Sequence, residues 1–154
     1  MIERSEPTDD ARIAGVLETC LYADDLPAIV RFYVRVLGLR VESAEEGRHA
    51  FFRVGRGMLL LFDPDRTERS GSGVPPHGSR GPGHVAFAVR AHSLDEWRAR
   101  LRELEVPVES EVVWPRGGIS LYLRDPAGNS VELTSPGIWD ISEDDVLGAS
   151  STGE

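Results

Sequence analysis

Three side chains in the sequence, Glu18, His84 and Glu132, could together bind a divalent metal ion. Carboxylate oxygens and imidazole nitrogens are ligands that Mn, Fe(II), Ni and Zn accept in proteins. A bound ion of this kind would coordinate two neighbouring oxygens of a substrate and stabilise negative charge that develops on them. Because the three residues are distant in the chain, they can act together only if the fold brings their strands to one surface.

The first half of the chain predicts a strand, a helix and three further strands. An alternating strand over residues 17–23 leads into a helix over residues 26–38. Asp25 is the expected N-cap of this helix, and Gly38 is a natural stop. The three further strands are expected over residues 39–43, 49–54 and 58–62.

The second half repeats this order. A strand over residues 84–89 precedes a helix over residues 94–104, and Ser93 with Glu96 has the spacing of a capping box. The turn Asp-Pro-Ala-Gly-Asn, residues 125–129, has strong turn chemistry. The remaining strands are expected over residues 108–113, 119–124 and 130–134.

The repeated pattern predicts an α+β fold of two tandem βαβββ modules, whose mixed sheets curl into one cleft with the helices outside. One domain is expected over residues 15–140, with the first module at about 15–64 and the second at about 83–140. A linker over residues 65–82, rich in Gly, Pro and Ser, would join them. Residues 1–14 and the acidic tail 141–154 are expected to be flexible.

Strand alternation predicts which side chains face the cleft. The larger apolar set of each strand should face its helix, which leaves Glu18, His84 and Glu132 on the cleft side. Glu18 and His84 occupy the same place in the two modules, and Glu132 is equivalent to Leu60. Three of the four positions related by the repeat can therefore ligate a metal.

Three stretches, ETCLYADDLPAIVRFYVRVLGLRV, GPGHVAFAV and LYLRDPAGNSVEL, resemble the vicinal-oxygen-chelate superfamily over roughly residues 16–137. That superfamily includes glyoxalase I, bleomycin-resistance proteins and extradiol dioxygenases. The resemblance implies that His84 and Glu132 are the metal ligands of the second module. Glu18 lies where the family more often has His or Gln, and Leu60 lies where glyoxalase I has a carboxylate. The three-ligand pattern looks more like the dioxygenases, but with Glu in place of one His.

Four further residues are candidates for binding a substrate. Phe52 and Tyr122 are expected at similar places in the third strands of their modules, and Tyr122 could donate a hydrogen bond to a substrate oxygen. Trp114 and Arg116 belong to a loop that should overhang one end of the cleft, where Arg116 could pair with a carboxylate. The competing interpretations are core packing for the three aromatic residues and a solvated position for Arg116.

Composition narrows the class of protein. A formal net charge of −9 argues against a nucleic-acid binder and against an anionic membrane surface. No apolar run approaches the roughly 20 residues of a membrane-spanning helix. The single cysteine, Cys20, allows no internal disulfide and fits a reducing compartment. A cytoplasmic protein without a signal peptide is the expectation, and open sheet edges favour a homodimer.

Two functions remain open from the sequence. The first is a metal-dependent lyase, isomerase or dioxygenase acting on a small oxygenated substrate. Glu18, His84 and Glu132 would bind an ion of Mn, Fe, Ni or Zn. A metal-bound water, or one of the carboxylates of Glu132 and Glu18 released from the ion, would serve as the base. The second is a metal-free protein that sequesters a drug or metabolite, as bleomycin-resistance proteins do. Leu60 in place of a fourth ligand, the aromatic candidates and the acidic charge motivate this alternative.

Overall fold

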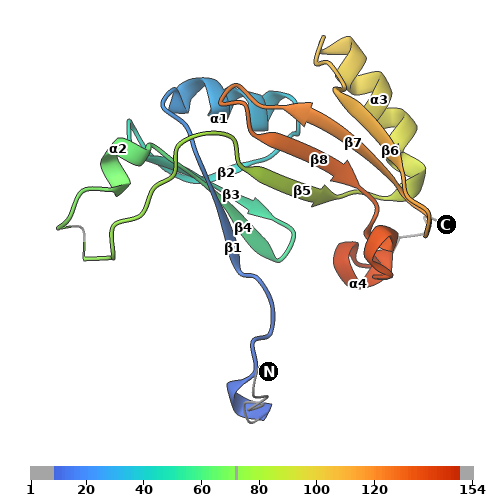
Figure 1. Ribbon diagram of the computed structural model, residues 1–154, viewed down its shortest axis with the longest axis horizontal. Helices are drawn as coiled ribbons and strands as arrows, with labels where there is room; N and C mark the ends of the chain where they lie inside the picture. The colour runs from blue at the N-terminus through green and yellow to red at the C-terminus, as the bar shows by residue number, and fades with distance from the viewer. Residues whose placement is uncertain (1–8, 72, 150–154) are drawn as a thin grey trace.

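Two four-stranded sheets, each with one long helix packed on it, form the body of the molecule (Figure 1). The computed structural model describes residues 9–71 and 73–149. In the first module β1 (Glu18–Tyr22) is followed by α1 (Leu26–Arg35) and by β2 (Val41–Glu45), β3 (His49–Val54) and β4 (Gly57–Phe62). In the second module β5 (His84–Ala88) is followed by α3 (Leu94–Glu103) and by β6 (Ser110–Val113), β7 (Ile119–Arg124) and β8 (Ser130–Thr134).

Both sheets have the same topology. The strand orders are β1-β4-β3-β2 and β5-β8-β7-β6, so each module's first strand pairs with its last. The β1–β4 and β5–β8 pairs are parallel, and the remaining strand pairs are antiparallel. The repeat expected from the sequence is therefore confirmed as two βαβββ modules in an α+β fold. The sheets do not close into a barrel.

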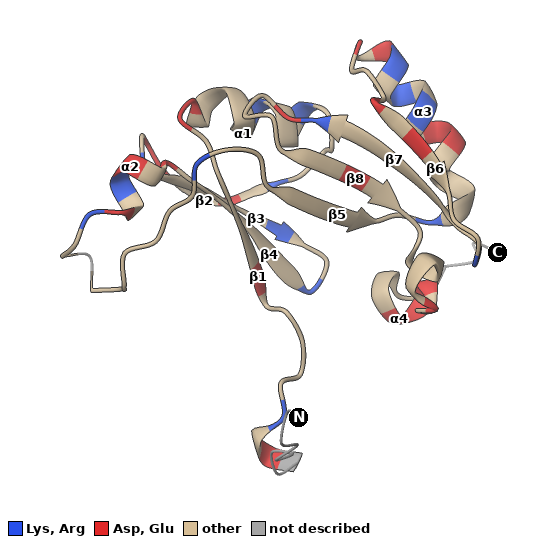
Figure 2. Cartoon of the chain, in the orientation of Figure 1, with Lys and Arg blue, Asp and Glu red and all other residues tan. Residues whose placement is uncertain are grey.

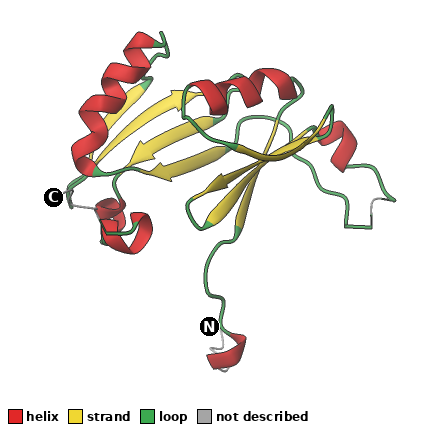
Figure 3. Cartoon of the chain, turned by 180° about the vertical axis from the view of Figure 1, so that it is seen from behind, coloured by secondary structure: helices red, strands yellow, loops and turns green. Residues whose placement is uncertain are grey.

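The buried core residues form one cluster that includes side chains of both modules and of helices α1 and α3. Figure 3 shows how the helices lie against the sheets. Ile29 and Tyr33 of α1 are fully buried in it, as are Leu121 of β7 and Val131 of β8. Removal of this apolar surface from water drives the folding of both modules. Because successive side chains of a strand point to opposite faces of the sheet, the face away from the core is free to carry polar side chains.

Helix α1 begins at Leu26 as the sequence predicts and ends at Arg35, with the expected stop residue Gly38 following shortly after. The Asp25 carboxylate accepts the backbone N–H of Ala28 at 3.0 Å, which satisfies one of the free donors of the first turn. Gly38 has φ +69°, the left-handed conformation typical of the residue that follows a helix.

The start of α3 differs from the expected capping box. Ser93 is the last residue of the 3₁₀ turn η2 (Ala91–Ser93), and its hydroxyl donates to the Arg90 carbonyl at 2.8 Å. Its backbone is already helical, with φ −88° and ψ −3°. A hydroxyl cap needs an extended backbone at that residue, so the prediction of a Ser93–Glu96 box is wrong.

Arg100 connects the two helices. From α3, its Nε donates to the Val36 carbonyl at 2.8 Å and its Nη2 donates to the Arg35 carbonyl at 2.7 Å. These carbonyls belong to the end of α1, where the helix has no partners of its own for them. The guanidinium thus caps α1 from the other module.

Several short elements were not expected from composition. The linker begins with α2 (Pro64–Thr67), and after η3 (Pro136–Trp139) the acidic tail forms α4 (Glu143–Leu147). Glu143 accepts the backbone N–H of Ala91 at 2.8 Å, so α4 is held against the start of the α3 segment. The described part of the acidic tail thus includes a short helix. Residues 1–8 and 150–154, which belong to the ends expected to be flexible, lie outside the described residues. In residues 9–71 and 73–149 no helix has the length and apolar character to cross a membrane.

Candidate functional site

A buried carboxylate occupies the concave face of the second sheet. The Glu132 side chain is 6% exposed, and its Oε1 accepts a hydrogen bond from the fully buried Ser120 hydroxyl. Ser120 Oγ in turn accepts the indole N–H of Trp114 at 2.8 Å. Because an indole N–H can only donate and a carboxylate oxygen can only accept, the direction of this relay is fixed from Trp114 through Ser120 to Glu132. The relay fixes the orientation of the carboxylate.

His84 lies beside the other oxygen of this carboxylate. Its Nε2 is 3.3 Å from Glu132 Oε2, and its Nδ1 is 3.1 Å from the Ser130 carbonyl oxygen. A carbonyl can only accept, so Nδ1 carries the proton, and a neutral imidazole then directs its Nε2 lone pair at the carboxylate. Two lone pairs at this separation repel unless a proton or a cation lies between them.

This arrangement fits a divalent metal ion. Metal-binding histidines usually donate their second ring N–H to a carbonyl or carboxylate, as His84 does to Ser130. The Ser120 hydroxyl bonds to Glu132 Oε1, and Oε2 is the oxygen that faces His84. His84 and Glu132 are thus two candidate ligands whose orientation is already set by their neighbours. The sequence predicted both residues, but it gave no indication of Ser120, which lies on the same face of β7 as Tyr122.

Tyr122 borders the same pair. It is opposite Glu132 in the β7–β8 register, and its ring centroid is 6.4 Å from that of His84. Burial, then the negative charge of Glu132 and a side-chain hydrogen bond to Glu132, raise the pKa of the Tyr122 hydroxyl. The phenol is therefore a neutral hydrogen-bond donor beside the two ligands, in the place that the sequence predicted.

Glu18 does not join them within the chain. Glu18 is exposed on β1 of the first sheet, whereas His84 and Glu132 lie on the second sheet. Figure 2 shows acidic positions in red on both β1 and β8. Within residues 9–71 and 73–149, no group of three or more His, Cys, Asp or Glu side chains is placed to hold a metal ion. Two of the three predicted ligands meet in one chain, and the third does not.

Phe52 lies elsewhere than expected. It is fully buried in the core on the helix side, 6.1 Å from the ring of Tyr33. Phe51 pairs with Leu60 as Tyr122 pairs with Glu132, so Phe51 is the residue equivalent to Tyr122. Its side chain lines the concave face. The expected equivalence of Phe52 with Tyr122 is therefore wrong by one residue, and of the two interpretations of Phe52 the structure supports core packing.

Trp114 and Arg116 differ in their contacts. The Trp114 indole reaches the buried network through Ser120, although 37% of the residue remains exposed. Arg116 pairs with Asp140 at 3.0 Å, and both side chains are largely exposed. Arg116 therefore already has a carboxylate partner at the surface, whereas Trp114 touches the group that orients Glu132.

Residues 15–133 match the family model of the Glyoxalase/Bleomycin resistance protein/Dioxygenase superfamily. The chain belongs to this superfamily. The family resemblance seen in the sequence is thereby confirmed. Membership covers both modules and the linker between them.

Individual members of the superfamily differ in chemistry. A crystal structure of lactoylglutathione lyase from Agrobacterium tumefaciens is 44% identical, with a TM-score of 0.82, and the match covers 85% of this chain and 100% of that chain. A putative ring-cleaving dioxygenase, MhqE of Bacillus subtilis (strain 168), is 28% identical over 114 residues, 68% of this chain and 36% of that protein. The chain thus spans about a third of the length of this curated relative.

A third member is a glyoxalase/bleomycin resistance protein/dioxygenase from Nocardioides. Its crystal structure is 26% identical, with a TM-score of 0.63, and the match covers 87% of this chain and 86% of that chain. The superfamily names therefore include a lyase, a dioxygenase and resistance proteins. Since one fold hosts many chemistries, the reaction has to be argued from the site.

Proposed function

We propose that this member of the superfamily is a metal-dependent enzyme that acts on a small oxygenated substrate, with His84 and Glu132 holding the ion. The observation that carries the proposal is the 3.3 Å approach of His84 Nε2 to Glu132 Oε2, with Nδ1 and Oε1 each bonded to a separate partner. An ion of Mn, Fe, Ni or Zn would polarise the substrate oxygens that it binds.

The residues around the pair have distinct roles in this proposal. Ser120 and the Ser130 carbonyl keep the two ligands in place, and the neutral Tyr122 hydroxyl can donate to a substrate oxygen. Proton transfer is assigned to a carboxylate, Glu132 or Glu18, since these are the predicted acids of the concave faces. Whether the net reaction is an isomerisation, a lyase reaction or a dioxygenation depends on the substrate.

Glu18 is proposed to enter the site from a second copy of the chain. It is exposed, and the segment leading to it extends away from the sheets (Figure 1). That segment also exposes Ile13, Val16 and Leu17, at 93%, 84% and 72%. Exposed apolar side chains grouped in this way mark an interaction surface. A homodimer that pairs the first module of one copy with the second module of the other would cover them and supply the third ligand.

Elemental analysis of protein purified without chelators tests the metal. We expect about one ion per chain in the wild type, and its loss in Glu132→Gln and in His84→Ala, because each variant removes one of two adjacent ligands. His92→Ala is the matched control, because His92 is an exposed imidazole of η2 outside the site. An unchanged metal content in Glu132→Gln contradicts the proposal.

A mixed dimer tests the origin of Glu18. Glu18→Ala and Glu132→Ala chains are produced separately and together, and the metal content of each dimer is measured. If Glu18 comes from the partner, the mixed dimer carries both substitutions in one site and none in the other. One site per mixed dimer is then expected to bind metal. If each chain builds its own site, every site in the mixed dimer has one defect, and no metal binding returns.

A metal-free binder is the second candidate. Leu60 occupies the place of a possible fourth ligand and lines a cavity of the first module, so an apolar side chain stands there instead of a metal ligand. A wild type that binds no metal and binds a cationic drug tightly without turnover would favour this function over the enzyme.

A further inference from the structure

The second half of the linker, residues 73–83, lies along the first module, and we call it the strap. Every residue of the strap except His77 is exposed, so no buried apolar side chain fastens it to the body of the molecule. Segments with few buried contacts open locally at a low cost in free energy. The position of the strap therefore depends mainly on its polar contacts.

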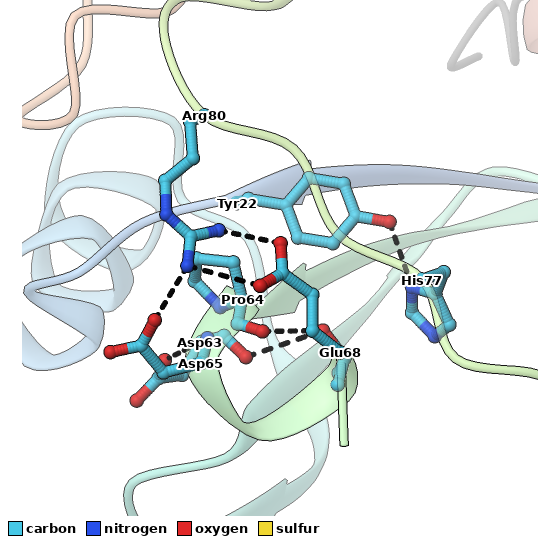
Figure 4. Close-up of polar contacts among 8 residues, drawn as sticks. Tyr22, Asp63, Pro64, Asp65, Glu68, His77 and Arg80 are labelled. Carbon is cyan, nitrogen blue, oxygen red and sulfur yellow. Dashed lines mark hydrogen bonds and ion pairs between the residues drawn. The ribbon is translucent and has the colours of Figure 1, made fainter. Parts of the chain in front are cut away.

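Arg80 makes the charged contacts of the strap (Figure 4). Its guanidinium lies 2.7 Å from a Glu68 oxygen and 2.6 Å from an Asp65 oxygen, both in the segment of helix α2. Gly78 passes directly against Glu68, since a β-carbon there would be only 2.5 Å from Glu68 Oε1. The charged side chains of Arg80, Asp65 and Glu68 are 50%, 71% and 47% exposed. Exposed ion pairs are weak and are screened by salt, so these pairs hold the strap loosely.

His77 makes the second set of contacts (Figure 4). Its Nδ1 lies 2.8 Å from the Tyr22 hydroxyl of β1, and its backbone N–H donates to the Thr67 carbonyl at 3.1 Å. The middle of the strap is thereby joined to the first sheet and to the end of α2. These are also single polar contacts, which water can replace when the strap moves.

The strap has the construction of a stiff segment between two hinges. Two consecutive prolines at positions 75–76 restrict the backbone of its first half. Gly73 and Gly81 have φ values of +83° and +90°, which glycine adopts readily and other residues do not. Beyond the second glycine the chain is fixed, because the Gly83 N–H donates to the buried Asn129 side chain at 2.7 Å. The part between the glycines can therefore swing while its far end stays in place.

A cavity of about 540 Å³ lies under the strap. Val74, Pro75 and His77 line it from the strap, and Glu18 of β1 and Leu60 of β4 line it from the sheet. The strap is thus one wall of the cavity. Movement of the strap away from β1 would open that wall to solvent.

Cys20 provides a natural reporter of this movement. It lies on the same face of β1 between Glu18, which lines the cavity, and Tyr22, which contacts the strap. The thiol is half-buried, and burial, followed by the negative charge of Glu18, raises its pKa. Since the chain has one cysteine, any thiol reaction of the protein occurs there.

We propose that the strap is a lid, which closes the cavity of the first module while the Arg80 ion pairs are formed and opens on its two glycine hinges when they break. Opening gives a ligand access to the concave face of the first sheet. Lid motions of this kind set the rates of entry and release in many enzymes. Where Glu18 acts as the third metal ligand, the strap also controls access to it, and only this consequence rests on the proposed function.

Alkylation of Cys20 in the full chain, with EDTA present, tests the lid. N-methylmaleimide and the larger N-(1-pyrenyl)maleimide carry the same reactive group, so the ratio of their rate constants, large over small, measures access and cancels the acidity of the thiol. Arg80→Gln removes both ion pairs, and we expect this ratio to rise about two- to tenfold. An increase in NaCl from about 0.05 to 0.5 M should raise the ratio in the wild type and leave it nearly unchanged in Arg80→Gln.

Arg66→Gln is the matched control, because Arg66 is an exposed arginine of α2 and its replacement removes the same charge without breaking the Arg80 pairs. Its ratio should equal that of the wild type. Tyr22→Phe removes the contact with His77 and should raise the ratio by an independent route. Neither Arg80→Gln nor Tyr22→Phe removes an apolar side chain from the core.

The same ratio in the wild type, Arg80→Gln and Tyr22→Phe overturns the inference. An equal acceleration of both reagents also overturns it, because that result reports the acidity of the thiol and not the opening of the strap. A ratio that changes with protein concentration would assign the effect to dissociation of chain copies and would likewise overturn it. Because EDTA is present throughout, failure of the metal proposal leaves these rates unaffected, and failure of the lid leaves the metal content unaffected.

Discussion

The Tyr33 hydroxyl of α1 donates a hydrogen bond to Asp125 Oδ2 at 3.0 Å, across 92 residues of sequence and from one module to the other. Asp125 also accepts the backbone N–H groups of Ala127 and Asn129 at 2.9 Å, and Asn129 accepts the Gly83 N–H at 2.7 Å. The turn between β7 and β8 is thereby fastened both to α1 and to the start of β5. His84 follows Gly83 directly, so this network also positions the strand that carries a proposed ligand.

Removal of the Tyr33 hydroxyl should destabilise the fold. Tyr33 and Asp125 are both buried, and Tyr33→Phe leaves a buried carboxylate short of one donor. A hydrogen bond to a charged group contributes about 1.5–3 kcal/mol, so urea denaturation should show a loss of about that size. Tyr22→Phe is the control, because its hydroxyl contacts the linker and should cost much less. Equal losses in the two variants would contradict a special role for Tyr33.

The same phenol predicts a dependence on alkaline pH. Burial, the negative charge of Asp125 and their hydrogen bond all raise the pKa of Tyr33 in the folded state. A raised folded pKa means that its contribution is fully present below the unfolded pKa of about 10 and is lost as the pH rises beyond it. The free energy of unfolding should therefore fall more steeply above pH 10 in the wild type than in Tyr33→Phe. Urea denaturation of both proteins from about pH 8 to 11 measures this, and parallel curves would refute it.

The fold was predictable because its signals are local. Residues 130–134 alternate polar and apolar side chains, and the strands expected over 49–54, 119–124 and 130–134 have the bounds of β3, β7 and β8. The same alternation placed Glu132 and His84 on the concave face. Period-two patterns report which face a residue occupies, so they were sufficient for these two.

The site was less predictable because its remaining parts depend on register and assembly. Phe51 and Phe52 are adjacent aromatic residues, and only the pairing of β3 with β4 distinguishes which of them faces the cleft. Ser120 has no sequence signature, since its role arises from its position between Trp114 and Glu132. The position of Glu18 relative to His84 and Glu132 depends on how the modules pair with one another. Strand patterns in the sequence do not encode that pairing.

The Arg100 cap should contribute measurably to stability. Its two charge-assisted bonds reach the Val36 and Arg35 carbonyls at 2.8 and 2.7 Å, but the guanidinium is partly solvated, so we expect about 1–2 kcal/mol from Arg100→Leu. Arg102→Leu, an exposed arginine of the same helix, is the control for helix propensity and net charge. Thermal unfolding should show a lower Tm for Arg100→Leu alone, and coincident melting curves would show that the cap contributes nothing.

The relay behind Glu132 predicts an effect on metal affinity without a change of ligand. In Ser120→Ala the donor to Glu132 Oε1 is lost, so the carboxylate can rotate away from His84. Loss of such a supporting contact typically lowers metal affinity about 10–100-fold. Trp114→Phe keeps the Ser120 hydroxyl and removes only the indole donor, so its effect should be smaller. Competition with a fluorescent chelator measures both affinities, with Ser110→Ala on the exposed strand β6 as the control. If Ser120→Ala binds metal as tightly as the wild type, the orientation of Glu132 does not depend on this hydroxyl.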